Sequence, residues 1–337
     1  MTIKSRVSIC IPTCNRPDLL LQCIESCLAQ THADIEILIG DDSPDDRTER
    51  LIAGRYGHAT RRLAYRRNRP SLGQTRNVAS LFARASGDKI LLIHDDDYLA
   101  PTGVERLLAQ WEHHPDLEVA FGNQYLVSPD GQVDLAASQR LNRLFHREPA
   151  AAGLQPLPGR TGIVQMFPNN GWLANAALVK QIDYVTDYDV CCDFVFGVRL
   201  CLAARSVCYI DEYVSYYRKT AVSVSQATRH TTNASSLAAW RFLKEISVPP
   251  ELEPARAVAL RRVAPIVVSL YARNHDARAA LQILLGSLDA YRFGLSPRLY
   301  YHLLMLCKSA WRSRKQAPAL APGANGQVSG SAGKRIS

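Results

Sequence analysis

The sequence has no long hydrophobic run. A helix that crosses a bilayer needs about 20 consecutive apolar residues, and no apolar run in these 337 residues reaches that length. The N-terminus passes from MTIKSR into VSICIP, a run too short for a signal-peptide core and without a small-residue cleavage site. We therefore expect no transmembrane segment, and we expect the protein to stay in the cytoplasm.

Patterns typical of disulfide and zinc proteins are also missing. The nine cysteines are an odd number and include no CxxC pair, and the spacing of Cys10, Cys14, Cys23 and Cys27 is poor for zinc. Without an export signal, this pattern indicates reduced thiols. We expect most of them to be buried as small hydrophobic side chains.

Acidic residues are absent from Lys308 to the C-terminus, where six basic residues stand. These charges account for most of the net charge of +9, so the basic balance says little about the rest of the chain. Aromatic residues do not alternate with the basic ones beyond Trp311, which argues against nucleic-acid binding. Residues 316–337 are rich in Ala, Pro, Gly and Ser, and we expect a disordered basic tail.

Hydrophobic residues make up 47% of the chain and charged residues 21%, which is enough for a large core. Short apolar runs alternate with segments of helical periodicity. The predicted strands are 7–11, 35–39, 63–65, 89–93, 117–121 and 206–217. The predicted helices are 16–28, 45–56, 74–86, 101–111 and 192–204, and 128–162 is predicted to be a loop over the ligand site. This alternation predicts an α/β fold with a doubly wound, mostly parallel sheet and helices on both faces.

Beyond Ser225 the pattern is helical, with predicted helices at 234–246, 253–273, 276–289 and 296–312. We divide the chain into an α/β domain over 1–228, an all-helical C-terminal region over 229–315, and the tail. The last helix combines an apolar stripe with a basic end. Such a helix can pack on the α/β domain, form a homodimer, or make a peripheral contact with the inner face of the membrane. All three readings stay open at this point.

Polar clusters follow the predicted strands at the end where such sheets bind ligands. Thr13 to Arg16 follow the first strand, Asp41-Asp42 the second, and Asp95-Asp96-Asp97 the fourth. Three adjacent carboxylates repel one another, and a divalent cation removes that penalty. The cluster therefore predicts a Mn²⁺ or Mg²⁺ site that phosphate oxygens and water complete. A solvated acidic turn is the alternative.

Four segments resemble the family 2 glycosyltransferases, which have the GT-A fold. They are VSICIPTCNRP, IEILIGDDSPDD, NRPSLGQTRNVA and ILLIHDDDYLAP, and the resemblance covers roughly residues 5–225. It implies an inverting, metal-dependent transferase with a nucleotide-sugar donor, expected to be a UDP-sugar. The implied acceptor is a saccharide or lipid-linked saccharide in surface polysaccharide biosynthesis.

The resemblance implies a nucleotide pocket lined by Pro12, Thr13, Cys14 and Arg16. In this reading Asp42 accepts a hydrogen bond from the uracil N–H, and Asp41 supports Asp42. Capping of the following helix is the alternative role for these two aspartates. Cys14 stands where relatives often carry an aromatic residue that stacks on the base.

The resemblance also assigns the residues around the diphosphate. Arg76 would approach the diphosphate or order the aspartates, and Arg218 would neutralise phosphate. Asp95 would contact the ribose or Arg76. Asp96 would be the main metal ligand, and Asp97 a second ligand, directly or through water. A position on the surface of a helix is the alternative for Arg76.

A general base must take the proton from the acceptor hydroxyl. DVCCDFVFGVRLCLA resembles the family segment that carries it, which implies Asp193. The acid that usually precedes the base is Cys192 here. Asp189 and Asp187 are fallbacks, and helix capping is the alternative role for Asp193.

Two further assignments concern the acceptor side and the closing segment. In PNNGWLANAAL, Trp172 would stack on a sugar and Asn169 or Asn170 would bind hydroxyls, with core packing as the alternative for Trp172. Thr220 stands where relatives carry a histidine. His94 is expected to point to the opposite side of its strand and to be structural.

Two other functions compete with this interpretation. A nucleotidyltransferase also uses carboxylates and Mg²⁺ on an α/β sheet, but it usually brings a glycine-rich phosphate loop with a lysine, and PTCNRPD has neither. A non-catalytic nucleotide-sugar-binding protein with the same fold stays open, because Cys192 and Thr220 depart from the family pattern.

Overall fold

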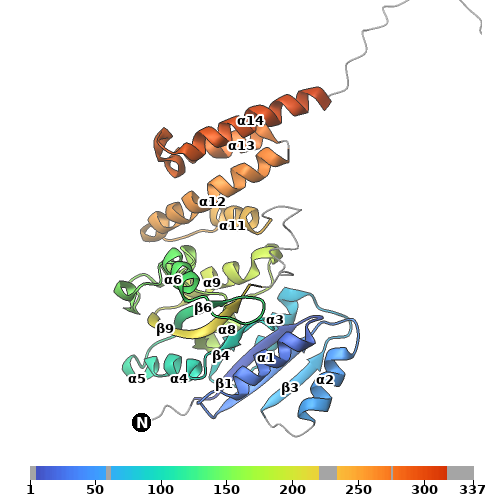
Figure 1. The fold of residues 1–337 in the computed structure, drawn as a ribbon. Coiled ribbons are helices and arrows are strands. Elements are labelled where there is room, and N and C mark those ends of the chain that lie inside the picture. The colour runs from blue at the N-terminus through green and yellow to red at the C-terminus, as the bar shows by residue number, and fades with distance from the viewer. Residues whose placement is uncertain (1–4, 58–61, 220–233, 275, 317–337) are drawn as a thin grey trace, which may run out of the picture. The chain divides into compact units, whose positions relative to one another are not determined.

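The computed structural model describes residues 5–57, 62–219, 234–274 and 276–316 (Figure 1). Its strands are β1 (Val7–Thr13), β2 (Ile35–Asp41), β3 (Leu63–Arg67), β4 (Lys89–Leu92), β5 (Tyr98–Leu99), β6 (Val119–Val127), β7 (Gly153–Leu154), β8 (Trp172–Asn175) and β9 (Val207–Arg218). They form one sheet in the order β3-β2-β1-β4-β8-β6-β9-β5, and β7 pairs with β9.

The N-terminal half of this sheet is parallel. β1 pairs in parallel with both β2 and β4, and β2 pairs in parallel with β3. β8 enters antiparallel between β4 and β6, while β6 and β9 are parallel. The α/β class and the flanking helices predicted from the sequence are confirmed.

Helices cover both faces because the strand side chains alternate between two cores. On one face, Ile9 and Ile11 of β1 meet the helices α1 (Pro17–Leu28), α2 (Arg47–Tyr56), α4 (Gly103–Leu108) and α5 (Gln110–His113). On the other face, Cys10 meets α3 (Gln74–Arg84), α7 (Pro158–Ile163), α8 (Ala176–Gln181) and α9 (Cys192–Ala203). Strands buried on both sides read as continuous apolar runs, as the sequence shows.

The segment 128–162 is not the loop that its composition suggested. It forms α6 (Leu135–Leu144), the 3₁₀ turn η1 (Pro149–Ala151), β7 and α7. The side chain of Asp134 caps α6 by accepting a hydrogen bond from the N–H of Ala137. Pro149 and Pro158 stand at the first positions of their helices, where proline is tolerated because that N–H needs no partner. The prolines therefore start helices here rather than break them.

The C-terminal part is helical, as predicted. It comprises α11 (Ala234–Glu245), η3 (Pro250–Leu252), α12 (Glu253–Arg273), α13 (Ala277–Leu285), η4 (Leu288–Gly294) and α14 (Pro297–Gln316). The chain divides into two compact units, Met1–Val267 and Val268–Ser337. This division falls after the boundary predicted at 228, because Phe242, Leu243 and Ala259 complete the core on the α9 face of the sheet.

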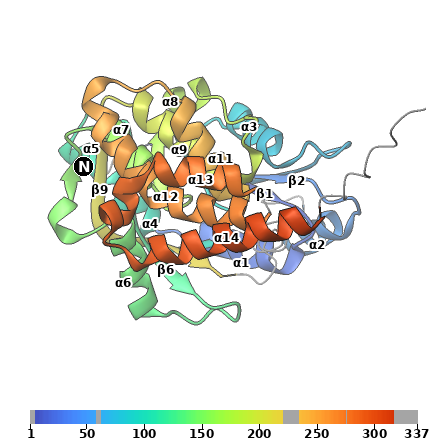
Figure 2. The same ribbon diagram turned by 90° about the horizontal axis from the view of Figure 1, so that it is seen from above.

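The second unit has a small core of its own. Tyr291 is fully buried and packs with Val268, Ala280 and Leu284. The helices α13 and α14 lie side by side (Figures 1 and 2). In the part of the chain that the structure describes, no helix is both long and apolar enough to cross a membrane. Thr220 and the predicted tail from residue 317 on lie outside the described residues.

Candidate active site

A cavity of about 530 Å³ lies where the parallel strands end. This volume is in the usual range for a small-molecule site. Loops after β1, β2 and β4 and the starts of α3 and α9 form its wall. The predicted site residues on this wall are Pro12, Thr13, Cys14, Arg16, Asp42, Asp95, Asp96, Asp97 and Asp193. The fold thus brings together residues that are up to 181 positions apart in the sequence, from Pro12 to Asp193.

Asp42 presents one unsatisfied oxygen. Its Oδ1 accepts hydrogen bonds from Asn68 Nδ2 at 2.7 Å and from the N–H of Leu72 at 3.1 Å. Its Oδ2 is buried and has no hydrogen-bond partner in the described chain. Buried acceptors are rarely left unpaired, so this oxygen marks a place for a ligand donor.

Asp41 supports the turn rather than lining the cavity. It is fully buried and accepts hydrogen bonds from the N–H of Ser43 at 2.8 Å and the hydroxyl of Tyr65 at 2.5 Å. The N-cap position of α2 belongs to Asp46. The alternative that Asp41 or Asp42 caps this helix is therefore wrong.

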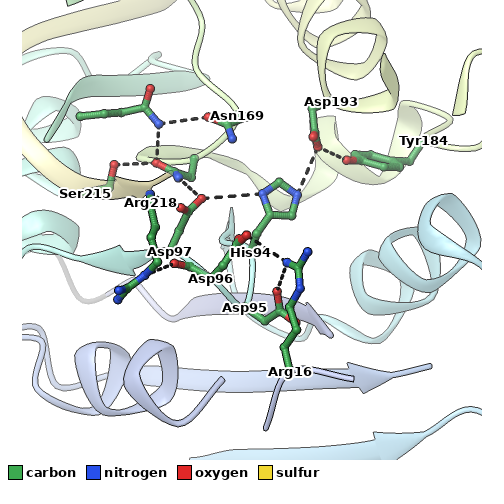
Figure 3. Close-up of polar contacts among 12 residues, drawn as sticks. Arg16, His94, Asp95, Asp96, Asp97, Asn169, Tyr184, Asp193, Ser215 and Arg218 are labelled. Carbon is green, nitrogen blue, oxygen red and sulfur yellow. Dashed lines mark hydrogen bonds and ion pairs between the residues drawn. The ribbon is translucent and has the colours of Figure 1, made fainter. Parts of the chain in front are cut away.

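Arg16, and not Arg76, holds the aspartate cluster (Figure 3). Its Nη1 lies 3.2 Å from Asp95 Oδ1 and 2.9 Å from Asp96 Oδ2. Thr13 donates a hydrogen bond to Asp95 at 2.7 Å. Arg76 is exposed on α3 and makes no ion pair with the aspartates in the described part of the chain. The prediction that Arg76 orders them is wrong, because its side chain starts on the solvent side of the helix.

Asp97 is the most constrained of the three aspartates. It is 2% exposed, and it accepts hydrogen bonds from the backbone N–H of Arg218 at 2.9 Å and from Asn170 Nδ2. Burial, together with the neighbouring Asp96, raises the pKa of Asp97 to about 7. Asn170 is itself fully buried and accepts from Ser215 at 2.7 Å. Asn170 therefore orients Asp97, and the prediction that it binds acceptor hydroxyls is wrong.

The Arg218 side chain makes hydrogen bonds to other parts of the protein. Its guanidinium donates to the backbone oxygens of Asp96 at 3.0 Å and Pro129 at 2.8 Å, and to Gln22 Oε1 at 2.6 Å. It does not line the cavity. Three of its five N–H donors thus have protein partners, and its role with substrate phosphate stays a prediction that these contacts do not support.

Trp172 belongs to the core. It is 1% exposed, and its ring centroid lies 5.5 Å from that of Phe167 and 5.7 Å from that of Phe196. The first residue of β8 points into the α9 side of the sheet, which leaves no face of the indole for a sugar. The acceptor role predicted for Trp172 is wrong, and its alternative role in the core is what the structure shows.

Of the three clustered aspartates on the cavity wall, Asp96 has the most exposed side chain. Its side chain is 15% exposed, against 6% for Asp95 and 1% for Asp97. The described residues contain no group of three or more His, Cys, Asp or Glu side chains arranged to hold a metal ion. The donor set fits a cation bound by one or two carboxylates and otherwise by substrate phosphate and water, which is a usual arrangement for Mg²⁺.

His94 faces the cavity, contrary to prediction (Figure 3). β4 ends at Leu92, so the alternation of a strand no longer fixes the direction of residue 94. Its Nε2 lies 3.4 Å from Asp193 Oδ1, and its Nδ1 lies 4.0 Å from Asp97 Oδ2. Burial alone would lower the pKa of His94, but Asp193 and then Asp97 outweigh burial and raise it to about 10.

Asp193 lies in the first turn of α9, with its side chain 28% exposed. The hydroxyl of Tyr184 donates a hydrogen bond to it. Burial acts to raise the pKa of Asp193, but His94 and the Tyr184 hydrogen bond lower it below the ordinary value. Asp187, a fallback for the base, is exposed and does not line the cavity. The side chain of Asp189 lies outside the described residues.

A second, smaller cavity of about 120 Å³ lies beside the first. Both cavities are lined by Asn169 and Asp193. Asp193 is thus the one acidic side chain, among the described residues, that faces both spaces. Neither Tyr184 nor this second cavity could be predicted from the sequence, since their residues come from segments without recognisable motifs.

Comparison with known proteins supports the family that the motifs indicate. The model of glycosyl transferase family 2 matches residues 8–169. An uncharacterized protein of Mycobacterium tuberculosis is 26% identical over 270 residues, which are 76% of this chain and 81% of that protein. Chondroitin synthase of Pasteurella multocida is 29% identical over 184 residues, which are 55% of this chain but only 18% of the synthase.

Two solved structures share the fold. S. aureus TarS 1-349 in complex with UDP has a TM-score of 0.53 at 16% identity, covering 85% of this chain and 89% of that one. A mannosyltransferase from Pyrobaculum calidifontis in complex with GDP-Man and Mn²⁺ has a TM-score of 0.56 at 13% identity, covering 92% and 88%. At such low identity these two matches show the fold alone. The family match over residues 8–169 supports the conclusion, and the two structures agree with the fold: the chain belongs to glycosyltransferase family 2, the nucleotide-sugar glycosyltransferases with the GT-A fold.

Proposed function

We propose that this protein is an inverting transferase that moves one sugar from a UDP-sugar to a saccharide or lipid-linked saccharide. The observation that carries the proposal is the position of Asp193 on the wall shared by two cavities. Direct displacement needs a base between the donor and the acceptor. The larger cavity has room and polar groups for the donor, and the same carboxylate also lines the smaller one.

The uridine preference rests on Asp42. Its buried Oδ2 has no partner in the described chain, and the N–H of a uracil ring is a donor that this oxygen can accept. A site built around such a bond discriminates against bases that lack the donor. S. aureus TarS, which has the same fold, binds UDP and UDP-GlcNAc.

The chemistry that follows is a single displacement at the anomeric carbon. The acceptor hydroxyl oxygen attacks that carbon, its proton passes to the Asp193 carboxylate, and the bond to the diphosphate oxygen breaks with its electron pair. Attack opposite to the leaving group inverts the configuration. Tyr184 and His94 contact Asp193 and hold the carboxylate in place.

A bound Mn²⁺ or Mg²⁺ would neutralise charge on the departing diphosphate. Asp96 would hold the cation, because it is the least buried of the three aspartates and lines the cavity. Asp97 would contribute through water, since its oxygens already accept two hydrogen bonds. Support from a neighbour comes from the P. calidifontis mannosyltransferase structure, which contains Mn²⁺.

The acceptor class is supported by the relatives. Chondroitin synthase of P. multocida and abequosyltransferase of Salmonella typhimurium, 33% identical over 113 residues, are both named for saccharide products or sugars that they transfer. We place the protein in surface polysaccharide assembly on this basis.

The test is Asp193→Asn in the full chain. We expect transfer from a panel of UDP-sugars with Mn²⁺ to fall by about 10²- to 10⁴-fold, while the Kd for UDP stays unchanged. Asp187→Asn is the matched control, because that exposed carboxylate should leave the rate unchanged. Full activity of Asp193→Asn would show that Asp193 is not the general base. A wild-type protein that binds UDP but transfers no sugar would favour the non-catalytic alternative.

A further inference from the structure

Arg147 is a buried cation that the proposed mechanism does not use. It follows α6 and is 3% exposed. Its Nε and Nη1 are buried and have no hydrogen-bond partner in the described chain, and none of the ion pairs of the described residues includes it. Its guanidinium lies 5.7 Å from the ring centre of Phe145. This contact with an aromatic ring supplies no hydrogen-bond acceptor, and burying a charge whose N–H groups lack acceptors destabilises a fold, so the two unpaired nitrogens point to a ligand.

The guanidinium faces the smaller cavity. Besides Arg147, the polar side chains on the cavity wall are Gln124, Gln165, Asn169 and Asp193. Asp193 is the single acid among them, and its charge is paired with His94. No carboxylate on the described wall is therefore left to neutralise Arg147.

A second cation reinforces the positive potential. Arg262 of α12 donates a hydrogen bond to Gln165 on the cavity wall, and its guanidinium lies 5.4 Å from the ring centre of Phe145. The neighbouring His146 lies in the same positive potential. Burial, then Arg160 and Arg262, lower the pKa of its imidazole. Burial lowers the pKa of Arg147 itself only to about 10, so it is cationic at neutral pH.

We propose that the smaller cavity is an acceptor subsite in which Arg147 binds an oxyanion, a carboxylate or a phosphate, of the acceptor saccharide. This inference rests on the proposed function, because it takes Asp193 as the base. A guanidinium offers two parallel N–H donors that match either oxyanion. The cavity holds about 120 Å³, and Asp193 lies on its wall. The charged group should therefore be on the sugar that carries the accepting hydroxyl or directly beside it.

The test compares two anionic probes with a neutral one at constant ionic strength. Glucuronate, glucose 6-phosphate and glucose are titrated into the full chain with saturating UDP and Mn²⁺, so that the donor site is filled. We expect one anion to bind the wild type and raise its Tm, while glucose does not. The anion that binds tells a carboxylate acceptor from a phosphate one.

The variants are Arg147→Met, Arg147→Lys and the control Arg143→Met. Arg143 lies in the last turn of α6, shortly before Arg147, with its side chain 75% exposed. Arg147→Met should weaken binding of the anion about ten- to a hundredfold, the loss of a charge-assisted hydrogen bond, with the Kd for UDP unchanged. Arg147→Lys should retain part of the binding, and Arg143→Met all of it.

Two results overturn the inference: neither anion binds the wild type more tightly than glucose, or Arg147→Met and Arg147→Lys bind the anion as tightly as the wild type does. Failure of the proposed function looks different, since the wild type would then not bind UDP or would not transfer sugar. Normal UDP binding and turnover with no anion binding therefore count against the subsite alone.

Discussion

At the scale of single residues, the site is defined by which polar atoms have partners and which do not. Asp95, Asp97 and Asn170 have their oxygens engaged by Arg16, Arg218 and Ser215. Asp42 Oδ2 and the Nε and Nη1 of Arg147 have no hydrogen-bond partner among the described residues. The engaged groups fix the shape of the site, and the open ones show where a ligand must supply the missing donor or acceptor.

Asp42→Asn tests the donor side of this pattern. The amide oxygen should stay toward Asn68 and Leu72, whose N–H groups need an acceptor. The amide NH₂ then replaces Oδ2 and meets the uracil N–H, donor against donor. We expect the Kd for UDP, measured by calorimetry, to rise about ten- to a hundredfold.

The same variant should change base preference. Cytosine presents an acceptor where uracil presents its N–H, so the preference for UDP over CDP should shrink in Asp42→Asn. Asp45→Asn is the control, because Asp45 is 45% exposed and pairs only with Arg47 among the described ion pairs. Equal UDP affinity in Asp42→Asn and wild type would contradict the assigned role of Asp42.

At the scale of elements, one carboxylate connects several segments at the end of the parallel strands that lies opposite to the site. Glu36 of β2 accepts hydrogen bonds from Ser8 of β1 at 2.5 Å, from the N–H of Ser86 at 2.6 Å and from the N–H of Gly87 at 3.2 Å. It links two strands with the turn that leads into β4. The loops at the other ends of these strands carry the site, so this anchor fixes the strands from which the site is built.

Glu36→Gln should lower the free energy of unfolding by about 1–3 kcal/mol, because charge-assisted hydrogen bonds are lost. Burial acts to raise the pKa of Glu36, but the Ser8 and Ser86 hydrogen bonds outweigh it and the pKa is lowered. A lowered acid pKa stabilises the fold above the ordinary value of 4.5, and this stabilisation is lost as pH falls through the folded pKa. Urea unfolding between pH 3 and pH 7, about the range of that titration, measures both effects.

The matched control is Glu49→Gln, whose carboxylate is 44% exposed and pairs with Arg67 and Arg69. Exposed pairs contribute about 0–1 kcal/mol, so its unfolding should stay near the wild type. If the two variants lose the same stability at pH 7, Glu36 is not the anchor that its contacts indicate.

At the scale of the whole molecule, the second unit exposes large apolar side chains. Phe293 is 80% exposed, Leu295 84% and Leu304 63%. Basic residues follow on α14, beginning with Lys308. An apolar surface with basic residues nearby is typical of helices that lie on anionic lipid. The peripheral membrane contact therefore stays our prediction, with a homodimer and packing on the α/β domain as the alternatives.

Leu295→Glu with Leu304→Glu should reduce flotation with anionic phospholipid vesicles at least about tenfold, since apolar burial in the interface is lost. Leu144→Glu is the control, because Leu144 is 60% exposed on α6 of the first unit. Added salt should weaken binding of the wild type. Unchanged flotation of the double variant would show that this surface does not bind the membrane. If the wild type sediments as a dimer and the double variant as a monomer, the homodimer is favoured.

The sequence by itself determined the α/β class, the strand ends that carry the site and the helical C-terminal part, because these depend on local periodicity and on motifs at strand ends. It did not show that Arg16 also holds the aspartates, that Arg76 is exposed, or that Arg218 and Trp172 have partners within the protein. The partners of these side chains come from segments distant in sequence, and only packing decides whether a side chain meets the core, another residue or the cavity. The same reason applies to His94, Tyr184 and Arg147. Their relation to Asp193 exists only once the strands, α9 and the segment after α6 are folded together.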